Sequence, residues 1–250
     1  IRDAGHRILA IDDFRNRRHW ADILVSDSSA PFDPALNRGP VKPRELLGAE
    51  YALVDPEFAF SDERLAAGGK KRLLVSYGGS DPTDETSKAL EAVRLLRQDP
   101  RGAGLGEVDV VVGPANTGRA RIIELAKGIA RTAIHLAPSS LAPLMLKSDI
   151  LLTAGGNSMV EALTMRKPCL VTLTSDNQAL IVAQLLEKRA IVSLGEHARV
   201  GPGDVAKAVT GAIADYERLS ERLETLALFD HHGARRISEA IQSMPLGINA

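Results

Sequence analysis

Two double-glycine segments carry the clearest chemical pattern in the chain, at residues 76–81 (SYGGSD) and 153–158 (TAGGNS). Glycine lets the backbone bend sharply or pass close to a ligand. Each segment follows an apolar run and precedes a predicted helix, and the N–H groups at a helix start favour an anion such as phosphate. Neither matches the P-loop GxxxxGK[ST] or the dinucleotide GxGxxG pattern. The spacing predicts phosphate binding without P-loop ATP hydrolysis or NAD-type hydride transfer, and ordinary turn formation stays open as the alternative.

Polar side chains follow the second glycine segment closely. Glu161 falls on the first turn of the predicted helix, where it suits a ribose diol or another neutral polyol better than a phosphate. An acid at an early helical position also complements the helix dipole, and the sequence does not separate these two roles. Asp176, Asn177 and Gln178 form a polar loop after the next strand, where they either hold sugar hydroxyls or serve only as a loop and helix cap.

Residues 149–178 must position these groups, and they read as one strand–helix–strand unit. The apolar run 150–152 predicts the first strand, and 169–173 the second. Asn157 or Ser158 is the expected cap of the intervening helix, at about 159–165, which ends before Pro168. Ligands of open α/β sheets bind at the carboxyl ends of the strands, which is where the glycine segments lie.

From residue 72 onward, predicted strands and helices alternate regularly. Strands are expected at 72–77, 108–112, 133–136 and 191–194, and helices at 85–98, 119–129, 141–147, 178–188 and 202–214. Thr83 or Asp84 is the expected cap of the first of these helices, and the last stretch, 216–243, reads as mostly helical. Alternation of this kind predicts an α/β fold with a parallel sheet covered on both faces.

The first 60 residues follow a different pattern. They contain two short predicted strands, at 8–11 and 22–27, and then an irregular stretch over 28–45. A charged, glycine-containing boundary follows near 61–71, so we expect one domain over 1–67 and another over 68–250. Because the chain begins with Ile1 and reaches a core strand almost at once, we infer that sequence has been lost upstream.

Composition excludes several classes of function. Hydrophobic residues make up 44% and charged residues 25% of the 250 residues, which is normal for a globular protein. The net charge of −1 argues against general electrostatic binding to nucleic acid. No apolar run approaches the roughly 20 residues of a membrane span. The single cysteine, Cys169, lies in a predicted core strand, which favours a packing role and a reducing compartment such as the cytoplasm. The six histidines show no metal-ligand spacing, so no metal site is predicted.

Several segments together resemble the PseG-like UDP-sugar hydrolases of pseudaminic acid biosynthesis and the related spore-coat polysaccharide glycosyltransferases. The matching segments are 11–27 (IDDFRNRRHWADILVSD), 46–58 (LLGAEYALVDPEF), 73–86 (LLVSYGGSDPTDET), 109–116 (DVVVGPAN), 154–163 (AGGNSMVEAL), 167–171 (KPCLV) and 175–178 (SDNQ). The glycine turns and DNQ are shared with the wider MurG-like, GT-B class, whereas 11–27 is more specific to PseG-like proteins.

This resemblance implies a GT-B-like fold of two Rossmann-like domains, with the first present here only as a remnant and UDP held mainly by the second. It implies hydrolysis of UDP-2,4-diacetamido-2,4,6-trideoxy-β-L-altropyranose to UDP and the free sugar, with no cofactor. The family's proposed base is a histidine in a G-x-GH turn that this chain lacks. Gly5-His6 lies at the wrong place, so the catalytic residue is unknown and its role is not transferred to His6 or His19.

Three alternatives remain: a GT-B glycosyltransferase with a UDP-sugar donor, a chain that binds UDP without turnover, and an epimerase. The resemblance assigns the residues of the nucleotide half by their motifs. The candidate substrate-binding residues are Gly78, Gly79, Ser80, Asn116, Gly155, Gly156, Asn157, Ser158, Glu161, Asp176, Asn177 and Gln178. Departures at AGGNSM and at 229–233, where the family usually has D-G-x-G, leave the sugar open.

Overall fold

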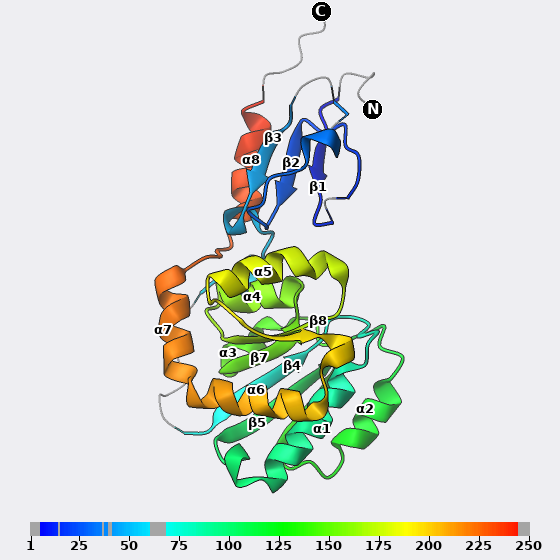
Figure 1. The fold of residues 1–250 in the computed structure, drawn as a ribbon, viewed down its shortest axis with the longest axis vertical. Helices are drawn as coiled ribbons and strands as arrows, with labels where there is room; N and C mark the ends of the chain where they lie inside the picture. Colours follow the sequence, from blue (N-terminus) through cyan, green and yellow to red (C-terminus); the bar gives the residue numbers. More distant parts are fainter. Residues whose placement is uncertain (1–5, 15, 37, 40–41, 61–68, 245–250) are drawn as a thin grey trace, which may run out of the picture. The chain divides into compact units, whose positions relative to one another are not determined.

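The computed structural model describes residues 6–14, 16–36, 38–39, 42–60 and 69–244. The chain forms two compact units, which Figure 1 shows. Unit 1 comprises Ile1–Pro56 and Leu228–Ala250, and unit 2 comprises Glu57–Ala227. Both are built on parallel sheets, as the sequence predicts for an α/β fold. In the described part of the chain, no helix is long and apolar enough to cross a membrane.

Unit 1 is a three-stranded parallel sheet in the order β1-β2-β3, with strands at Leu9–Ile11, Ile23–Ser26 and Arg44–Leu47. Helix α8, Gly233–Gln242, belongs to the same unit. The described residues between 28 and 43 are irregular apart from the 3-10 turn Pro34–Leu36, as predicted, but the predicted extension of this stretch to residue 45 is wrong, because strand β3 begins at Arg44. It pairs in parallel with β2, and Leu46 is buried in the small core. Its four residues begin with Arg44 and Glu45, so the apolar pattern was too short to reveal a strand.

Helix α8 packs on this sheet. Ile237 and Ala240 join a core with Ile23, Val25 and Leu46. The helix start also touches another part of unit 1, because a Cβ at Gly233 would lie only 2.0 Å from the Ala52 carbonyl oxygen. The grouping therefore differs from the predicted division between 67 and 68, and the predicted boundary itself falls outside the described residues. The interpretation of the two units as separate domains remains a prediction.

An ion pair within unit 1 gives a pH-dependent contribution to stability. Asp230 accepts two hydrogen bonds from the Arg236 guanidinium, at 2.8 and 2.6 Å, and these lower the pKa of Asp230 to about 2. A carboxyl whose pKa is depressed on folding stabilises the fold above its unfolded pKa of about 4, and this contribution is lost as the pH falls towards 2.

We therefore expect Asp230→Asn to lower the unfolding midpoint of unit 1 at pH 5, with the difference from wild type shrinking between pH 4 and about pH 2. Trp20 is the only tryptophan of the chain and lies in unit 1, so its fluorescence follows this unit. Arg235→Ala is the matched control, because that arginine forms an exposed ion pair with Glu239, which contributes little to stability. A constant difference between variant and wild type over this pH range would contradict the assignment.

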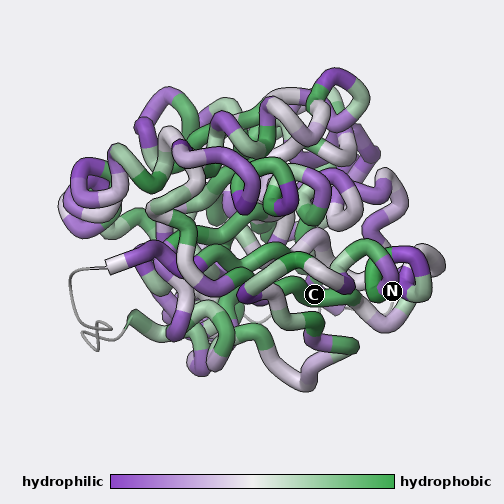
Figure 2. Tube along the Cα trace, turned by 90° about the horizontal axis from the view of Figure 1, so that it is seen from below, coloured by the Kyte–Doolittle hydropathy of each residue, from purple (hydrophilic) through white to green (hydrophobic). Residues whose placement is uncertain are grey.

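Unit 2 is a six-stranded parallel sheet in the order β6-β5-β4-β7-β8-β9. Its strands are β4 Lys71–Ser76, β5 Leu105–Val112, β6 Thr132–Leu136, β7 Ile150–Ala154, β8 Cys169–Leu173 and β9 Val192–Glu196. Its helices are α1 Glu85–Gln98, α2 Arg119–Ala126, α3 Ala142–Lys147, α4 Asn157–Thr164, α5 Ala179–Glu187, α6 Pro202–Ala214 and α7 Tyr216–Leu226. Strands and helices alternate as predicted. Figure 2 shows that hydrophobic and hydrophilic stretches also alternate along the chain.

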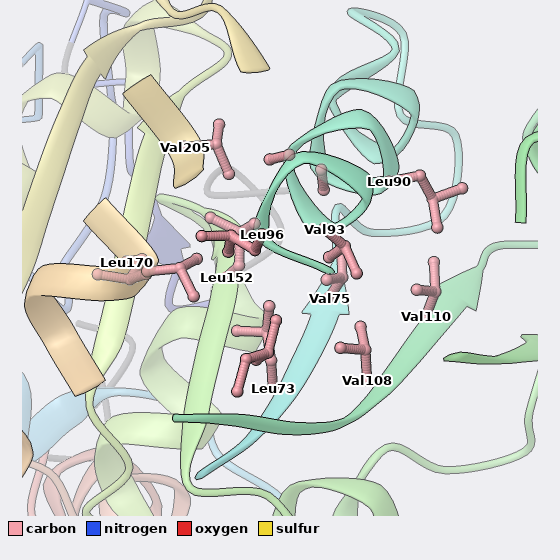
Figure 3. Close-up of a cluster of buried hydrophobic side chains, with 14 of the residues drawn as sticks. Leu73, Val75, Leu90, Val93, Leu96, Val108, Val110, Leu152, Leu170 and Val205 are labelled. Carbon is pink, nitrogen blue, oxygen red and sulfur yellow. The ribbon is translucent and has the colours of Figure 1, made fainter. Parts of the chain in front are cut away.

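One hydrophobic core of unit 2 lies on the face of the sheet that α1, α2 and α6 cover. Alternate residues of the strands point into it, so that Leu73 and Val75 of β4 meet Val93 and Leu96 of α1 (Figure 3). Connections between parallel strands are right-handed, so the helices that join the strands after the reversal of strand order cover the opposite face. Those helices include α4 and α5. The core is aliphatic, as the low aromatic content predicts.

Candidate functional site

The two glycine turns lie side by side at the centre of the unit 2 sheet. From β4 the chain proceeds through β5 to β6 at one edge, whereas β7, β8 and β9 proceed towards the other edge. The strand order therefore reverses between β4 and β7, which pair with Ser76 opposite Thr153. The Thr153 hydroxyl donates to the Ser76 carbonyl at 2.7 Å. In open α/β sheets this reversal point is where ligands bind.

Backbone contacts fix the first glycine turn. Gly78 has a φ of +77°, in the left-handed region that favours glycine. Gly113, at the end of β5, lies directly against the turn, because a Cβ there would be 2.4 Å from the carbonyl oxygens of Gly78 and Gly79. The Ala115 N–H donates to the Gly79 carbonyl at 2.9 Å. Gly78, Gly79 and the following Ser80 are exposed, so their outer side is open to a ligand.

A carboxylate of the chain itself already binds the start of α1, the helix after the first glycine turn. Asp81 accepts the N–H groups of Glu85 and Thr86, both at 2.9 Å, and its side chain is buried. Asp84 occupies the cap position, as one of the two predicted candidates, but it is in a left-handed conformation and its side chain makes no cap hydrogen bond, so Asp81 supplies the capping carboxylate instead. A carboxylate that accepts two N–H groups leaves this helix start little capacity for a phosphate.

The helix after the second turn is different. Helix α4 begins at Asn157, its cap residue is Gly156, and among the described residues no side chain caps it. The predicted cap by Asn157 or Ser158 is wrong because both residues are inside the helix. A Cβ at Gly156 would meet nothing within 4 Å. The second turn thus combines an uncapped helix N-terminus with open space, which is the arrangement that suits an anion.

A methyl group at this position tests the open space. Gly156 has a φ of −110°, outside the left-handed region, but it is the cap residue of α4, where alanine is less favourable than glycine, so Gly156→Ala should lower the unfolding midpoint only slightly and leave the chain folded. We expect the new methyl group to weaken UDP binding about ten-fold, the scale of one lost hydrogen-bonded contact. Calorimetric titration measures the affinity, and Gly203→Ala, also with open space around its Cβ, is the control. Unchanged UDP affinity would remove Gly156 from the site.

Glu161 lies on the second turn of α4 and not, as predicted, on the first. The helix begins two residues earlier than the sequence indicated, so Glu161 is its fifth residue and its first turn contains no acid. A helix dipole acts within the first turn, which weakens the alternative that Glu161 only complements it. The side chain is half-buried.

The loop after β8 stands next to the second glycine turn. Asp176–Gln178 forms a 3-10 turn between β8 and α5. The Ser175 hydroxyl donates to Asn177 Oδ1 at 2.5 Å. Gln178 contacts the glycine turn itself, since its Oε1 accepts the Gly155 N–H at 3.2 Å. Because β4, β7 and β8 are consecutive in the sheet, their three loops lie next to one another.

Asn116 is less well placed. It follows β5, and its Oδ1 accepts the Gly118 N–H at 2.7 Å within its own turn. Sequence reasoning missed the residues that hold the loops in place, namely Asp81 and Gly113. The spacing of Asp81 from Glu85 resembles a cap, but only the contact shows which acid serves as one.

The sequence analysis did not predict the buried polar side chains near these loops. The Tyr77 hydroxyl and Thr172 Oγ1 are 3.1 Å apart, across the small side chain of Ala154, and burial raises the pKa of Tyr77 well above its usual range. Burial likewise raises the pKa of Glu85, whose Oε1 lies 2.7 Å from Lys88 Nζ. Tyr77 is held neutral and Glu85 is paired with Lys88, so we assign neither residue a catalytic role.

The remaining reactive side chains have structural partners. Cys169 is buried and its pKa is raised by burial, which agrees with the predicted packing role. His135 lies 2.7 Å from Asp109 on the sheet of unit 2. In unit 1, His19 Nε2 lies 2.6 Å from Asp12 Oδ2. Within the described part of the chain, no group of three or more His, Cys, Asp or Glu could hold a metal ion.

Comparison with known proteins finds solved structures that share this fold. No family model matches the chain. Over 97% of its length it superposes on MurG of Acinetobacter baumannii with a TM-score of 0.65 and 14% identity, covering 68% of that structure. Over 90% it superposes on the glycotransferase of kitacinnamycin with a TM-score of 0.61 and 20% identity, covering 55% of that structure. The chain therefore has a GT-B-like fold built on Rossmann-like parallel sheets.

Two curated proteins are similar in sequence. The spore coat polysaccharide biosynthesis protein SpsG of Bacillus subtilis is 26% identical over 202 residues, which covers 79% of this chain and 58% of that protein. The uncharacterized protein MJ1062 of Methanocaldococcus jannaschii is 28% identical over 138 residues, 52% of this chain and 27% of that protein. The chain thus spans less than two thirds of either relative, and its likeness is to a polysaccharide biosynthesis protein and to GT-B folds, not specifically to a UDP-sugar hydrolase.

Proposed function

We propose that unit 2 binds the UDP moiety of a nucleotide sugar and that the protein transfers the sugar to an acceptor in surface polysaccharide synthesis. The observation that carries this proposal is the uncapped start of α4 beside a glycine turn, at the point where the strand order reverses. The likeness to SpsG supports the polysaccharide context. A structural neighbour, HepE of Anabaena, was solved with UDP and glucose, and its fold matches with a TM-score of 0.55 at 14% identity.

In this proposal each element has a distinct task. The first N–H groups of α4 bind the diphosphate and stabilise the charge that builds up as UDP departs. Glu161, on the same helix, accepts hydrogen bonds from the ribose hydroxyls. The first glycine turn, with Gly78, Gly79 and Ser80, supplies exposed backbone and hydroxyl groups from the neighbouring strand. Asp176 and Asn177 follow β8 and serve the sugar.

Hydrolysis of a UDP-linked diacetamido-trideoxy sugar is the second candidate. It is kept because of the segment 11–27, which resembles the PseG-like hydrolases, and in which His19 pairs with Asp12. The fold and the curated relative favour the transferase over this more specific reaction.

The two candidates differ in where the sugar goes. We would incubate the chain with UDP-N-acetylglucosamine, and separately with the UDP-diacetamido sugar, and follow UDP and free sugar by NMR. A transferase releases little UDP until a polysaccharide acceptor fraction is added, and the sugar then appears on the acceptor. A hydrolase releases UDP and free sugar in equal amounts without an acceptor, which would overturn the transferase proposal. A new UDP-sugar without released UDP would indicate an epimerase instead.

A further inference from the structure

The side-chain amide of Gln178 joins the ends of two neighbouring strands. Its Oε1 accepts the Gly155 N–H at 3.2 Å and the Thr174 N–H at 3.0 Å. Gly155 directly follows β7 and Thr174 directly follows β8, whose pairing ends at Ala154 and Thr172. The Gln178 amide therefore links β7 and β8 just beyond their last backbone pairing. It holds together the two loops that follow these strands.

These contacts fix the orientation of the amide. A backbone N–H can only donate, so the atom that faces both N–H groups must be the oxygen. The Nε2 atom then lies 3.1 Å from Thr174 Oγ1. A carboxamide oxygen has two lone pairs, and the two N–H donors occupy them. The oxygen of Gln178 is consequently not available to a sugar hydroxyl.

Packing holds Gly155 in the same place. It is buried, and a Cβ there would lie 2.6 Å from Val182 Cγ2 and 3.0 Å from Gln178 Cβ. Its N–H is already bound by Gln178, so the N–H groups open to an anion belong to the residues after it. Gly155 thus shapes the turn, and the start of α4 presents the donors.

We propose that Gln178 is a positioning residue of the diphosphate site: it binds the Gly155 N–H, holds the second glycine turn so that α4 presents its first N–H groups, and does not contact the sugar. This inference rests on the proposed function, because it takes the second turn as the diphosphate site. It differs from the alternative in the sequence analysis in which Gln178 holds sugar hydroxyls.

Affinities for three ligands separate the two roles. Gln178→Met keeps the length of the side chain and removes both polar atoms. We expect it to weaken UDP about ten-fold, the scale of one misplaced hydrogen-bonding group, and to leave uridine within about two-fold, because uridine has no diphosphate. The ratio of the UDP-N-acetylglucosamine and UDP dissociation constants should not change. Gln98→Met, at an exposed glutamine of α1, is the matched control.

Hydrogen exchange tests the same contact without any ligand. In Gln178→Met, faster exchange should be confined to the peptides covering 153–158 and 173–177. Gln178→Glu retains acceptor oxygens for both N–H groups, so we expect exchange like that of wild type there. This second variant also keeps the test valid if Gln178→Met does not fold.

Each other outcome has a defined meaning. Unchanged UDP affinity with weakened UDP-N-acetylglucosamine in Gln178→Met would show a sugar contact and overturn the proposal. Equal weakening of uridine and UDP, with faster exchange across the whole sheet, would show a general structural role and also overturn it. If wild type binds none of the three ligands, the proposed function fails, while exchange still decides the inference: localised acceleration supports the positioning contact, and unchanged exchange overturns it.

Discussion

Replacing Glu161 by alanine should weaken UDP binding about 10- to 150-fold, which corresponds to about 1.5–3 kcal/mol for a lost charge-assisted hydrogen bond. The half-buried carboxylate lies on the second turn of α4, on the helix whose start we assign to the diphosphate. A ribose diol offers two hydroxyl donors to one carboxylate, which gives the strongest hydrogen bonds in the proposed site. Calorimetric titration with UDP measures this loss.

The carboxylate and its position can be tested separately. Glu161→Gln keeps one acceptor oxygen without the charge, so its affinity should fall between those of wild type and the alanine variant. Glu124→Ala, on the exposed side of α2, should bind UDP as wild type does. Equal affinity in Glu161→Ala and wild type would sink the ribose assignment and leave Glu161 as a surface acid.

Replacing Gly113 by alanine should destabilise unit 2 by about 3 kcal/mol, at the upper end of the cost of overpacking. The new Cβ would lie 2.4 Å from two carbonyl oxygens and 2.5 Å from the Cα of Gly79, so backbone and not a flexible side chain has to move. The first glycine turn would shift with it, and UDP affinity should fall as well. Urea unfolding followed by circular dichroism, with calorimetry on the folded fraction, measures both effects.

The same substitution elsewhere should have the opposite effect. Gly211 lies within α6, and a Cβ there would meet nothing within 4 Å. Gly211→Ala should stabilise the unit by about 0.5–1 kcal/mol, because alanine favours a helix over glycine. If Gly113→Ala is as stable as wild type, the close contact between the first turn and the end of β5 is not present in solution.

The sequence predicts most elements of unit 2 because local patterns coincide with the packing. The strand at Cys169–Leu173 and the helices at Glu85–Gln98 and Pro202–Ala214 have the predicted bounds, and all are strongly apolar at the expected period. The sequence pattern predicts the start of α4 two residues too late, because Asn157 resembles a cap. Glycine serves as the cap residue there, which composition alone does not indicate.

Unit 1 was harder to predict because its elements depend on distant partners. Strand β3 is four residues long and is stabilised by pairing with β2. Helix α8 shows helical periodicity, but periodicity does not say which sheet the helix covers. Its place in unit 1 follows from long-range contacts of Ile237 and Ala240.

The sequence likewise predicts only part of the candidate site. Residue types and spacing identify the glycine turns, Glu161 and the loop 176–178 as candidates. They do not identify which N–H groups are already bound. Asp81 occupies the start of α1 and Gln178 binds the Gly155 N–H, and both facts depend on side-chain directions that sequence patterns leave open. The assignment of these residues to UDP remains a prediction.

Calorimetric titration of the whole chain with UDP, with UMP, ATP and NAD as comparisons, tests the central claim most directly. The account predicts selective binding of UDP, weaker binding of UMP because one phosphate is absent, and no comparable binding of ATP or NAD. Binding of UDP that Gly156→Ala and Glu161→Ala both weaken would place the nucleotide at the second glycine turn. Equal affinity for all four nucleotides, or UDP binding that neither variant changes, would contradict a uridine diphosphate site there.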